Sequence, residues 1–308
     1  MTKLVLSTGN VMSAGGPMII RKSGASTRSN LELVSSLRDH FAAARQDYAP
    51  RANDGGDTAT PPPLAPVGEW TEREGKTWYI PRISWRAGGL REEASQYEIT
   101  VKLFLLPDTP VAERERYARE ALGLVSKELG VQTVDLLVIS FPGMSFEGNC
   151  EWEADKINAQ QGSLEDQVAT WTVFEELHRQ GVVKRLGVAE FGSQRLADFI
   201  ARTAIRPAVD QINLRDCCNV PPPLKKLADD EGIELNVHTD CTDILPQGTL
   251  QELLGPGPQG AGVLGDAHND GSHGTLSPQW VVRYVAFVRD RGVVENKGYF
   301  AGATLAEL

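Results

Sequence analysis

The sequence predicts an α/β fold, namely a (β/α)8 barrel that forms a single domain over residues 1–308. Short runs rich in Val, Ile and Leu alternate with amphipathic stretches of helical period, which indicates parallel strands joined by helical crossovers. Eight such runs occur in 308 residues, and this is the size of a (β/α)8 barrel. A doubly wound open sheet is the alternative. The barrel is favoured because no Gly-x-Gly-x-x-Gly follows any of the runs.

The N-terminal part of the chain contains the first strand and helix. A strand over 4–8 precedes a helix that begins at Ser29 or Asn30. Its apolar face consists of Leu31, Val34, Leu37 and Phe41. Residues 47–75 are rich in Gly, Asp and Pro and are predicted to be a flexible insertion. A weak edge strand follows over 77–85, because Pro81 lacks one hydrogen-bond donor.

Strands and helices then alternate without interruption. The strands are predicted over 99–106, 134–140, 183–188, 208–214 and 232–238. The helices between them are predicted over 110–129, 164–180, 193–204 and 221–231. Gly130 and Gly181 directly follow the first two helices, as is typical of helix C-termini.

The C-terminal part is predicted to complete the barrel. A short helix is expected over 242–255, and a Gly-rich loop over 255–277 follows it. A last helix over 280–289 is expected to lead into an eighth strand at 293–294.

The composition narrows the function classes. Lys and Arg total 31 against 41 Asp and Glu, so the net charge of −10 argues against a nucleic-acid or anionic-membrane partner. No apolar run approaches the ~20 residues that span a bilayer, and the N-terminus does not resemble a signal peptide. Four cysteines are too few for a disulfide scaffold. We therefore expect a cytoplasmic protein with reduced thiols.

Active groups of a barrel lie at the C-terminal ends of its strands. The candidates there are Ser140, Glu190, Cys217, Cys218, His238 and Cys241, with Lys102 inside its strand. The cysteines and His238 are of the types that bind zinc, but adjacent cysteines rarely chelate one ion. The favoured interpretation is that the cysteines are packing residues and that no metal is bound. These residues alone predict no particular reaction.

Four segments resemble the aldo-keto reductase family, and together they cover most of the chain from 98 to 297. They are residues 134–142 (VDLLVISFP), 186–191 (LGVAEF), 207–212 (PAVDQI) and 291–294 (RGVV). In that family a tyrosine donates a proton to the substrate carbonyl, a lysine lowers the pKa of that tyrosine, an aspartate holds the lysine and a histidine orients the carbonyl.

The departures from the family pattern indicate a degenerate active site. Lys102 matches the family lysine, but Ser140 replaces the histidine, and no Asp-x-x-x-x-Tyr follows the 77–85 strand. Glu190 replaces the asparagine that holds the nicotinamide, and His238 replaces the tyrosine that stacks on its ring. Gln211 is retained. Of the phosphate-binding cluster only Lys297 and its surroundings remain.

A narrower resemblance is to the glutamate–cysteine ligase regulatory (modifier) subunit family. Residues 210–222 (DQINLRDCCNVPP) are similar to that family's Asn-Gln-Val-Asn-Leu-x-x-Cys-Cys-x-x-Pro-Pro. Further matches are residues 7–10 (STGN), 101–104 (VKLF), 237–240 (VHTD), 280–284 (WVVRY) and 291–299 (RGVVENKGY).

This resemblance implies a non-catalytic subunit that binds the catalytic subunit of glutamate–cysteine ligase. The implied effects are a higher affinity for glutamate and relief of feedback inhibition by glutathione. It also implies that no cofactor is bound. Two alternatives remain, an NADPH-dependent aldo-keto reductase and a redox-sensing scaffold built on Cys217, Cys218 and Cys241.

Overall fold

The computed structural model describes residues 1–13, 29–50, 64–86, 88–214, 219–241, 243–265 and 274–307. Within these ranges ten strands form one sheet in the order β2-β3-β1-β10-β9-β4-β5-β6-β7-β8. The strands are β1 (Thr2–Ser7), β2 (Glu72–Glu74), β3 (Thr77–Ile80), β4 (Tyr97–Leu105), β5 (Val134–Ser140), β6 (Val183–Ala189), β7 (Val209–Asn213), β8 (Glu234–His238), β9 (Gly274–Val288) and β10 (Val293–Glu307). The α-helices are α1 (Ser29–Asp47), α2 (Val67–Trp70), α3 (Arg114–Leu129), α4 (Glu151–Asn158), α5 (Leu164–Arg179), α6 (Ser193–Ile200), α7 (Pro222–Glu231) and α8 (Thr249–Leu254).

Strands β4 to β8 pair in parallel and are joined by helices α3 to α7. The sequence predicts these strands and helices except α4, which lies in a stretch predicted to be a loop. Local signals set the helix ends. Gly130 ends α3 with φ of 69°, and Gly232 ends α7 with φ of 67°. Both values lie in the left-handed region that favours glycine. The side chain of Ser163 caps α5 by accepting the backbone N–H of Asp166 at 3.2 Å.

The predicted helix over 280–289 is wrong, because residues 274–288 form β9. This strand pairs antiparallel with β10 and with β4. The even-numbered side chains at 280, 282, 284, 286 and 288 are all buried, so the apolar pattern has the period of a strand. The odd-numbered positions also carry apolar residues, Val281, Val285 and Phe287, which hides this alternation in the sequence.

The antiparallel β9–β10 hairpin also corrects the expectation of eight parallel strands. β1 pairs antiparallel with β10, so three successive pairings from β1 to β4 are antiparallel. The α/β class is confirmed, and β4 to β8 carry the βα repeat of a (β/α)8 fold. Among the described strands, β2 and β8 stand at opposite ends of the sheet.

Three of the predicted irregular or helical stretches also need correction. The stretch 47–75 contains α2 and β2, and Trp70 is fully buried because it packs against Phe41 of α1. The loop over 255–277 ends earlier than expected, because β9 begins at Gly274. The helix predicted over 242–255 is confined to α8. Residues 51–63 and 266–273 lie outside the described residues.

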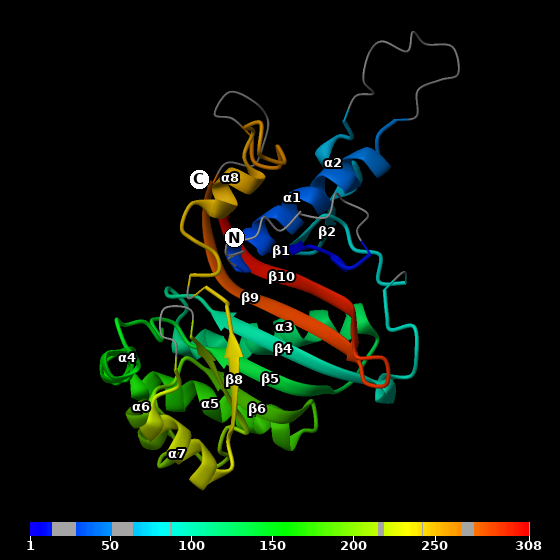
Figure 1. Cartoon of the computed structure of the whole chain (residues 1–308). Helices are drawn as coiled ribbons and strands as arrows, with labels where there is room; N and C mark the ends of the chain where they lie inside the picture. Colours follow the sequence, from blue (N-terminus) through cyan, green and yellow to red (C-terminus); the bar gives the residue numbers. More distant parts are fainter. Residues whose placement is uncertain are drawn as a thin grey trace.

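The molecule has two large apolar cores. One lies between strands β4 to β9 and helices α3, α5, α6 and α7, and it includes the buried Trp171, Phe174 and Phe199. The other joins β1 and β10 to α1 and α8 through residues such as Leu37 and Leu253. Figure 1 shows α1, α2 and α8 on one side of the hairpin and α3 to α7 on the other. No helix in the described ranges combines the length and apolar character that crossing a membrane requires.

Candidate functional site

A buried ionic cluster lies where the two cores meet. Lys102 of β4 is 2% exposed, and its Nζ lies 2.8 Å from Oδ2 of Asp240, which directly follows β8 and is 5% exposed. Arg283 of β9 donates to both carboxylate oxygens of Asp240, with 3.0 Å between Nη2 and Oδ2. One carboxylate therefore serves two buried cations.

The electrostatics of the cluster follow from burial and proximity. Burial lowers the pKa of Lys102, and the nearby Asp240 opposes that shift. Burial acts to raise the pKa of Asp240, but the charges of Lys102 and Arg283 outweigh it and hold that pKa below its usual range. Asp240 is therefore ionised at neutral pH and neutralises Lys102.

Glu190 and His238 extend this cluster across the strand ends. Nδ1 of His238 accepts the backbone N–H of Asp240 at 3.0 Å. Nε2 of the same ring lies 2.7 Å from Oε1 of Glu190. Glu190 has φ of 64° and is held by two neighbours. Asn158 of α4 donates to the carbonyl oxygen of Glu190 at 2.6 Å, and the backbone N–H of Glu190 donates to the carbonyl of Gln211 at 2.8 Å.

Asp210 and Gln211 of β7 lie beside this group. Asp210 is fully buried, and its Oδ1 accepts the backbone N–H of Phe191 at 3.4 Å. Burial raises its pKa well above the usual value, and the neighbouring Glu190 adds to the shift. Oε1 of Gln211 is buried and has no hydrogen-bond partner among the described residues.

Neither Ser140 nor Lys297 is hydrogen-bonded to the Lys102–Asp240 pair among the described residues. Ser140 is the last residue of β5 and pairs with Phe104 of β4. Within the described part of the chain it makes no hydrogen bond to Lys102. Lys297 of β10 forms an ion pair with Glu32 of α1, and Tyr299 donates to the same carboxylate at 3.2 Å. Lys297 thus fastens α1 to the hairpin.

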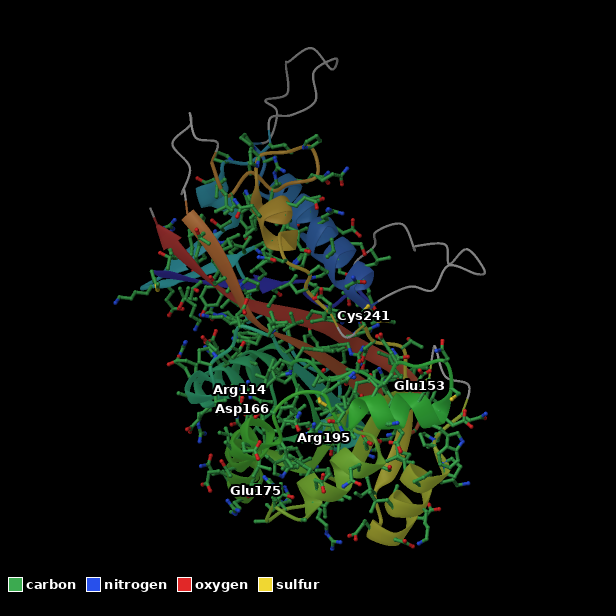
Figure 2. The ribbon with its side chains drawn as sticks, turned by 90° about the vertical axis from the view of Figure 1, so that its left-hand side faces the viewer. Arg114, Glu153, Asp166, Glu175, Arg195 and Cys241 are labelled. Carbon is green, nitrogen blue, oxygen red and sulfur yellow. The ribbon has the colours of Figure 1, made fainter. Side chains whose placement is uncertain are left out.

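Of the three predicted redox cysteines the structure describes one. Cys217 and Cys218 lie outside the described residues. Cys241 is a free, half-buried cysteine beside the start of α1 (Figure 2). Its backbone N–H donates to Oγ of Ser29 at 2.8 Å, and its Sγ lies 3.3 Å from Oδ1 of Asn30. Among the described residues no three His, Cys, Asp or Glu side chains gather as a metal site.

Sequence reasoning missed Asp240, Arg283 and Asn158. Asp240 lies within the 237–240 segment that matches the family, but no spacing in the sequence relates it to Lys102. Arg283 was placed in a predicted helix, where its partner could not be identified. A single charged residue in an otherwise apolar run, such as Arg283 within 280–288, is the one available signal.

A second group of buried polar residues holds together the helices that pack on the core beside β4 to β9. Arg114 of α3 donates to Oγ1 of Thr170 at 2.7 Å, and Figure 2 shows it beside Asp166, both on the helical side of the sheet. Glu175 of α5 accepts the backbone N–H groups of Ala204 and Ile205 at 2.8 Å each. These contacts are structural, since each polar atom is used to close a loop or a helix end.

The parallel strands and the cluster at their ends define the class of protein. The profile of the aldo/keto reductase family matches residues 83–253, more than half of the chain, and the chain belongs to this family.

Several relatives that match about two thirds of the chain are named as glutamate–cysteine ligase regulatory subunits. A Schizosaccharomyces pombe protein, provisionally named as a glutamate–cysteine ligase regulatory subunit, is 29% identical over 69% of this chain and 73% of its own length. The human glutamate–cysteine ligase regulatory subunit is 24% identical over 69% of this chain and 68% of its own length. An aldose reductase of Dictyostelium discoideum is 28% identical over 41% of this chain and 43% of its own length.

The solved structures that resemble the chain are aldo-keto reductases. A Bombyx mori aldo-keto reductase in complex with NADP is 21% identical, covers 44% of this chain and 40% of its own, and has a TM-score of 0.32. An aldose reductase of Giardia lamblia is 20% identical, covers 44% of each chain, and has a TM-score of 0.31.

The residues present do not fit a nicotinamide. The family asparagine that would hold its carboxamide is Glu190, whose carboxylate faces His238 instead. The only feature that favours a bound amide is the buried, unpartnered Oε1 of Gln211. The Lys102–Asp240 pair itself resembles the lysine held by an aspartate in the family.

Proposed function

We propose that the chain is a non-catalytic regulatory subunit of glutamate–cysteine ligase in the cytoplasm. It binds the catalytic subunit, raises the affinity of that subunit for glutamate and relieves its inhibition by glutathione. The observation that carries the proposal is the set of relatives named as this subunit, which are 24–29% identical over 69% of this chain. The family lysine keeps an aspartate partner here, but Ser140 stands in place of the family histidine, and no Asp-x-x-x-x-Tyr follows the 77–85 segment.

Such regulation requires only differential binding. The subunit must bind more tightly to the conformer of its partner that holds glutamate than to the one that holds glutathione. A tenfold change in affinity corresponds to about 1.4 kcal/mol of coupling, which a single interface supplies.

The experiment combines the purified chain with the matching catalytic subunit. We expect a stable complex on size exclusion, a lower KM for glutamate and a higher glutathione concentration at half-inhibition. An unrelated acidic protein at equal concentration serves as the control. Absence of a complex, or a complex with unchanged glutamate and glutathione dependence, would refute the proposal.

Membership of the aldo/keto reductase family favours NADPH-dependent reduction as the second candidate. We propose that the chain binds no NADPH and reduces no aldehyde, because Glu190 replaces the asparagine, Ser140 replaces the histidine and no Asp-x-x-x-x-Tyr follows the 77–85 segment. General acid catalysis contributes about 10²–10⁴-fold, so the rate without it should fall near background.

The test of this candidate is NADPH fluorescence titration with an aldehyde reduction assay. We expect no saturable binding and no turnover above buffer. Micromolar binding that weakens in Gln211→Ala, together with turnover that disappears in Lys102→Met, would establish the reductase instead.

A further inference from the structure

The ring of His238, the last residue of β8, has contacts that favour opposite protonation states. Its Nδ1 accepts the backbone N–H of Asp240 at 3.0 Å, and a ring nitrogen that accepts a hydrogen bond carries no proton. The same Nδ1 lies 3.6 Å from Oδ2 of Asp240, and Nε2 lies 2.7 Å from Oε1 of Glu190. Two carboxyl groups this close favour the protonated imidazole, because an opposite charge stabilises it.

The other charged groups around the ring do not decide between the two forms. Lys102 of β4 and Arg283 of β9 bind Asp240 and oppose a further positive charge. Asp210 of β7 lies beside Glu190, but burial holds its pKa well above the usual value, so it contributes little negative charge. The buried Nε2 of the ring, although close to Glu190, is not aligned for a hydrogen bond with any described residue. The ring is therefore fully satisfied in neither form.

A proton on Nδ1 removes the acceptor that holds the segment after β8. The ring then directs an N–H at the N–H of Asp240, and two donors cannot share a hydrogen bond. By turning, the ring can donate to Oδ2 of Asp240 instead. The segment 239–241 then loses its bond to the ring. This segment contacts the start of α1, since the N–H of Cys241 donates to Oγ of Ser29 at 2.8 Å (Figure 2).

We propose that His238 is a pH-sensitive latch for residues 239–241. Its neutral ring holds the backbone N–H of Asp240 and keeps the segment in place beside α1. Its protonated ring releases that N–H and binds the carboxyl groups of Glu190 and Asp240. The step is the gain of one proton from solvent at Nδ1, and no bond between heavier atoms changes. The latch goes beyond the proposed function and does not depend on it, because it operates in the isolated chain.

The first test is a pH titration of the isolated wild-type chain, followed by NMR of the histidine ring nitrogens. Imidazoles titrate between about pH 5 and pH 8. Over this range we expect the His238 signal to change from a neutral ring with a bare Nδ1 to a doubly protonated ring. The variant His238→Asn lacks this signal and therefore assigns it. A ring that keeps one protonation state over the whole range would overturn the proposal.

Amide hydrogen exchange tests the release of the backbone. After correction for the intrinsic pH dependence of exchange, the protection of the Asp240 N–H should fall about three- to tenfold between pH 8 and pH 5. His238→Asn places an oxygen near the position of Nδ1 and should make the protection independent of pH. His238→Gln lacks that acceptor and should give low protection at both ends of the range. Equal pH dependence in the wild type and His238→Asn would overturn the proposal.

Two further variants distinguish the latch from a general effect of pH. His178 is the matched control, because its Nδ1 lies 3.0 Å from the carbonyl oxygen of Val183, a contact that protonation of the ring does not break. His178→Asn should leave the pH dependence at Asp240 unchanged. Glu190→Gln removes one carboxyl charge and should move the change to lower pH by about one pH unit. A loss of the pH dependence in His178→Asn, or an unmoved transition in Glu190→Gln, would contradict the latch.

Discussion

Two regions of the molecule contribute strands to the same sheet, but they differ in how far apart in the sequence the paired strands lie. In the parallel half, β4 to β8 with α3 to α7, each strand pairs with a neighbour close in the sequence, as Thr100 with Leu136. In the hairpin half, β1, β9 and β10 with α1 and α8, strands from the two ends of the chain pair, as Thr2 with Leu305. Closing a long loop costs entropy before any contact forms, so the second half depends on the first. The aldo/keto reductase profile, over residues 83–253, covers the parallel half and ends before the β9–β10 hairpin.

The two halves meet along the β4–β9 pairing, and one carboxylate links side chains of both strands. Lys102 belongs to β4, Arg283 belongs to β9, and both bind Asp240. Substitutions in this group of Lys102, Asp240 and Arg283, the ion centre, therefore test how strongly the hairpin half is coupled to the parallel half. The predictions for the two halves run from the largest expected effect to the smallest.

Asp240→Ala should be the most damaging, because it leaves two buried cations facing each other without a counter-charge. We expect a loss of about 3–5 kcal/mol in the free energy of unfolding, measured by urea denaturation. Glu98→Ala is the matched control, since Glu98 forms an exposed pair with Arg289 at 3.4 Å across the same two strands. That pair should contribute no more than about 1 kcal/mol. Equal losses in the two variants would show that the ion centre does not couple the halves.

Gly302→Ala tests the packing of the hairpin half. A Cβ at this position would lie 2.2 Å from Cε2 of Trp280, whose side chain is fully buried and cannot move aside. Overpacking of this kind costs about 1–3 kcal/mol, again measured by urea denaturation. Gly257→Ala has nothing within 4 Å of the added carbon and should be nearly neutral. An unchanged urea midpoint of unfolding in Gly302→Ala would mean that β9 and β10 separate easily.

Asp210→Asn tests the buried acid of the parallel half through pH. Burial raises the pKa of Asp210, so this group favours the folded state below its unfolded pKa of about 3.9 and loses that contribution as the pH rises. The asparagine variant lacks this loss and should be more stable than the wild type at pH 7 by about 1 kcal/mol or more.

The measurement for Asp210→Asn is thermal unfolding at pH 4, 5.5 and 7. The stability difference from the wild type should grow steadily over this range. The exposed Asp290→Asn serves as the control and should show no such trend. A difference independent of pH would mean that Asp210 is ionised in the folded protein.

Gly123→Ala should have the smallest effect and the opposite sign. Gly123 is exposed in the middle of α3, and nothing lies within 4 Å of an added Cβ. Alanine should stabilise the protein by about 0.5–1 kcal/mol, because it restricts the unfolded chain and favours a helix. Calorimetry should show a higher Tm, and a lower one would indicate that α3 carries strain at this position.

The sequence alone was sufficient for the α/β class and for the strands and helices between residues 97 and 238, apart from α4. The reason is that their signals are local: a 3.6-residue apolar period, Ser163 at the start of α5, and glycines at the ends of α3 and α7. It also identified Lys102, Glu190, Gln211 and His238 as rim residues, because each lies in or next to a predictable strand.

Only the tertiary structure decided that residues 280–288 form a strand and that Asp240 binds both Lys102 and Arg283. A run with apolar residues on both faces loses the period that separates strand from helix, and its state is then set by the strands that pair with it. The partner of a buried charge is likewise set by which chain segments meet in space. Lys102, Asp240 and Arg283 come from segments far apart in the sequence, and no local pattern of residues records that meeting.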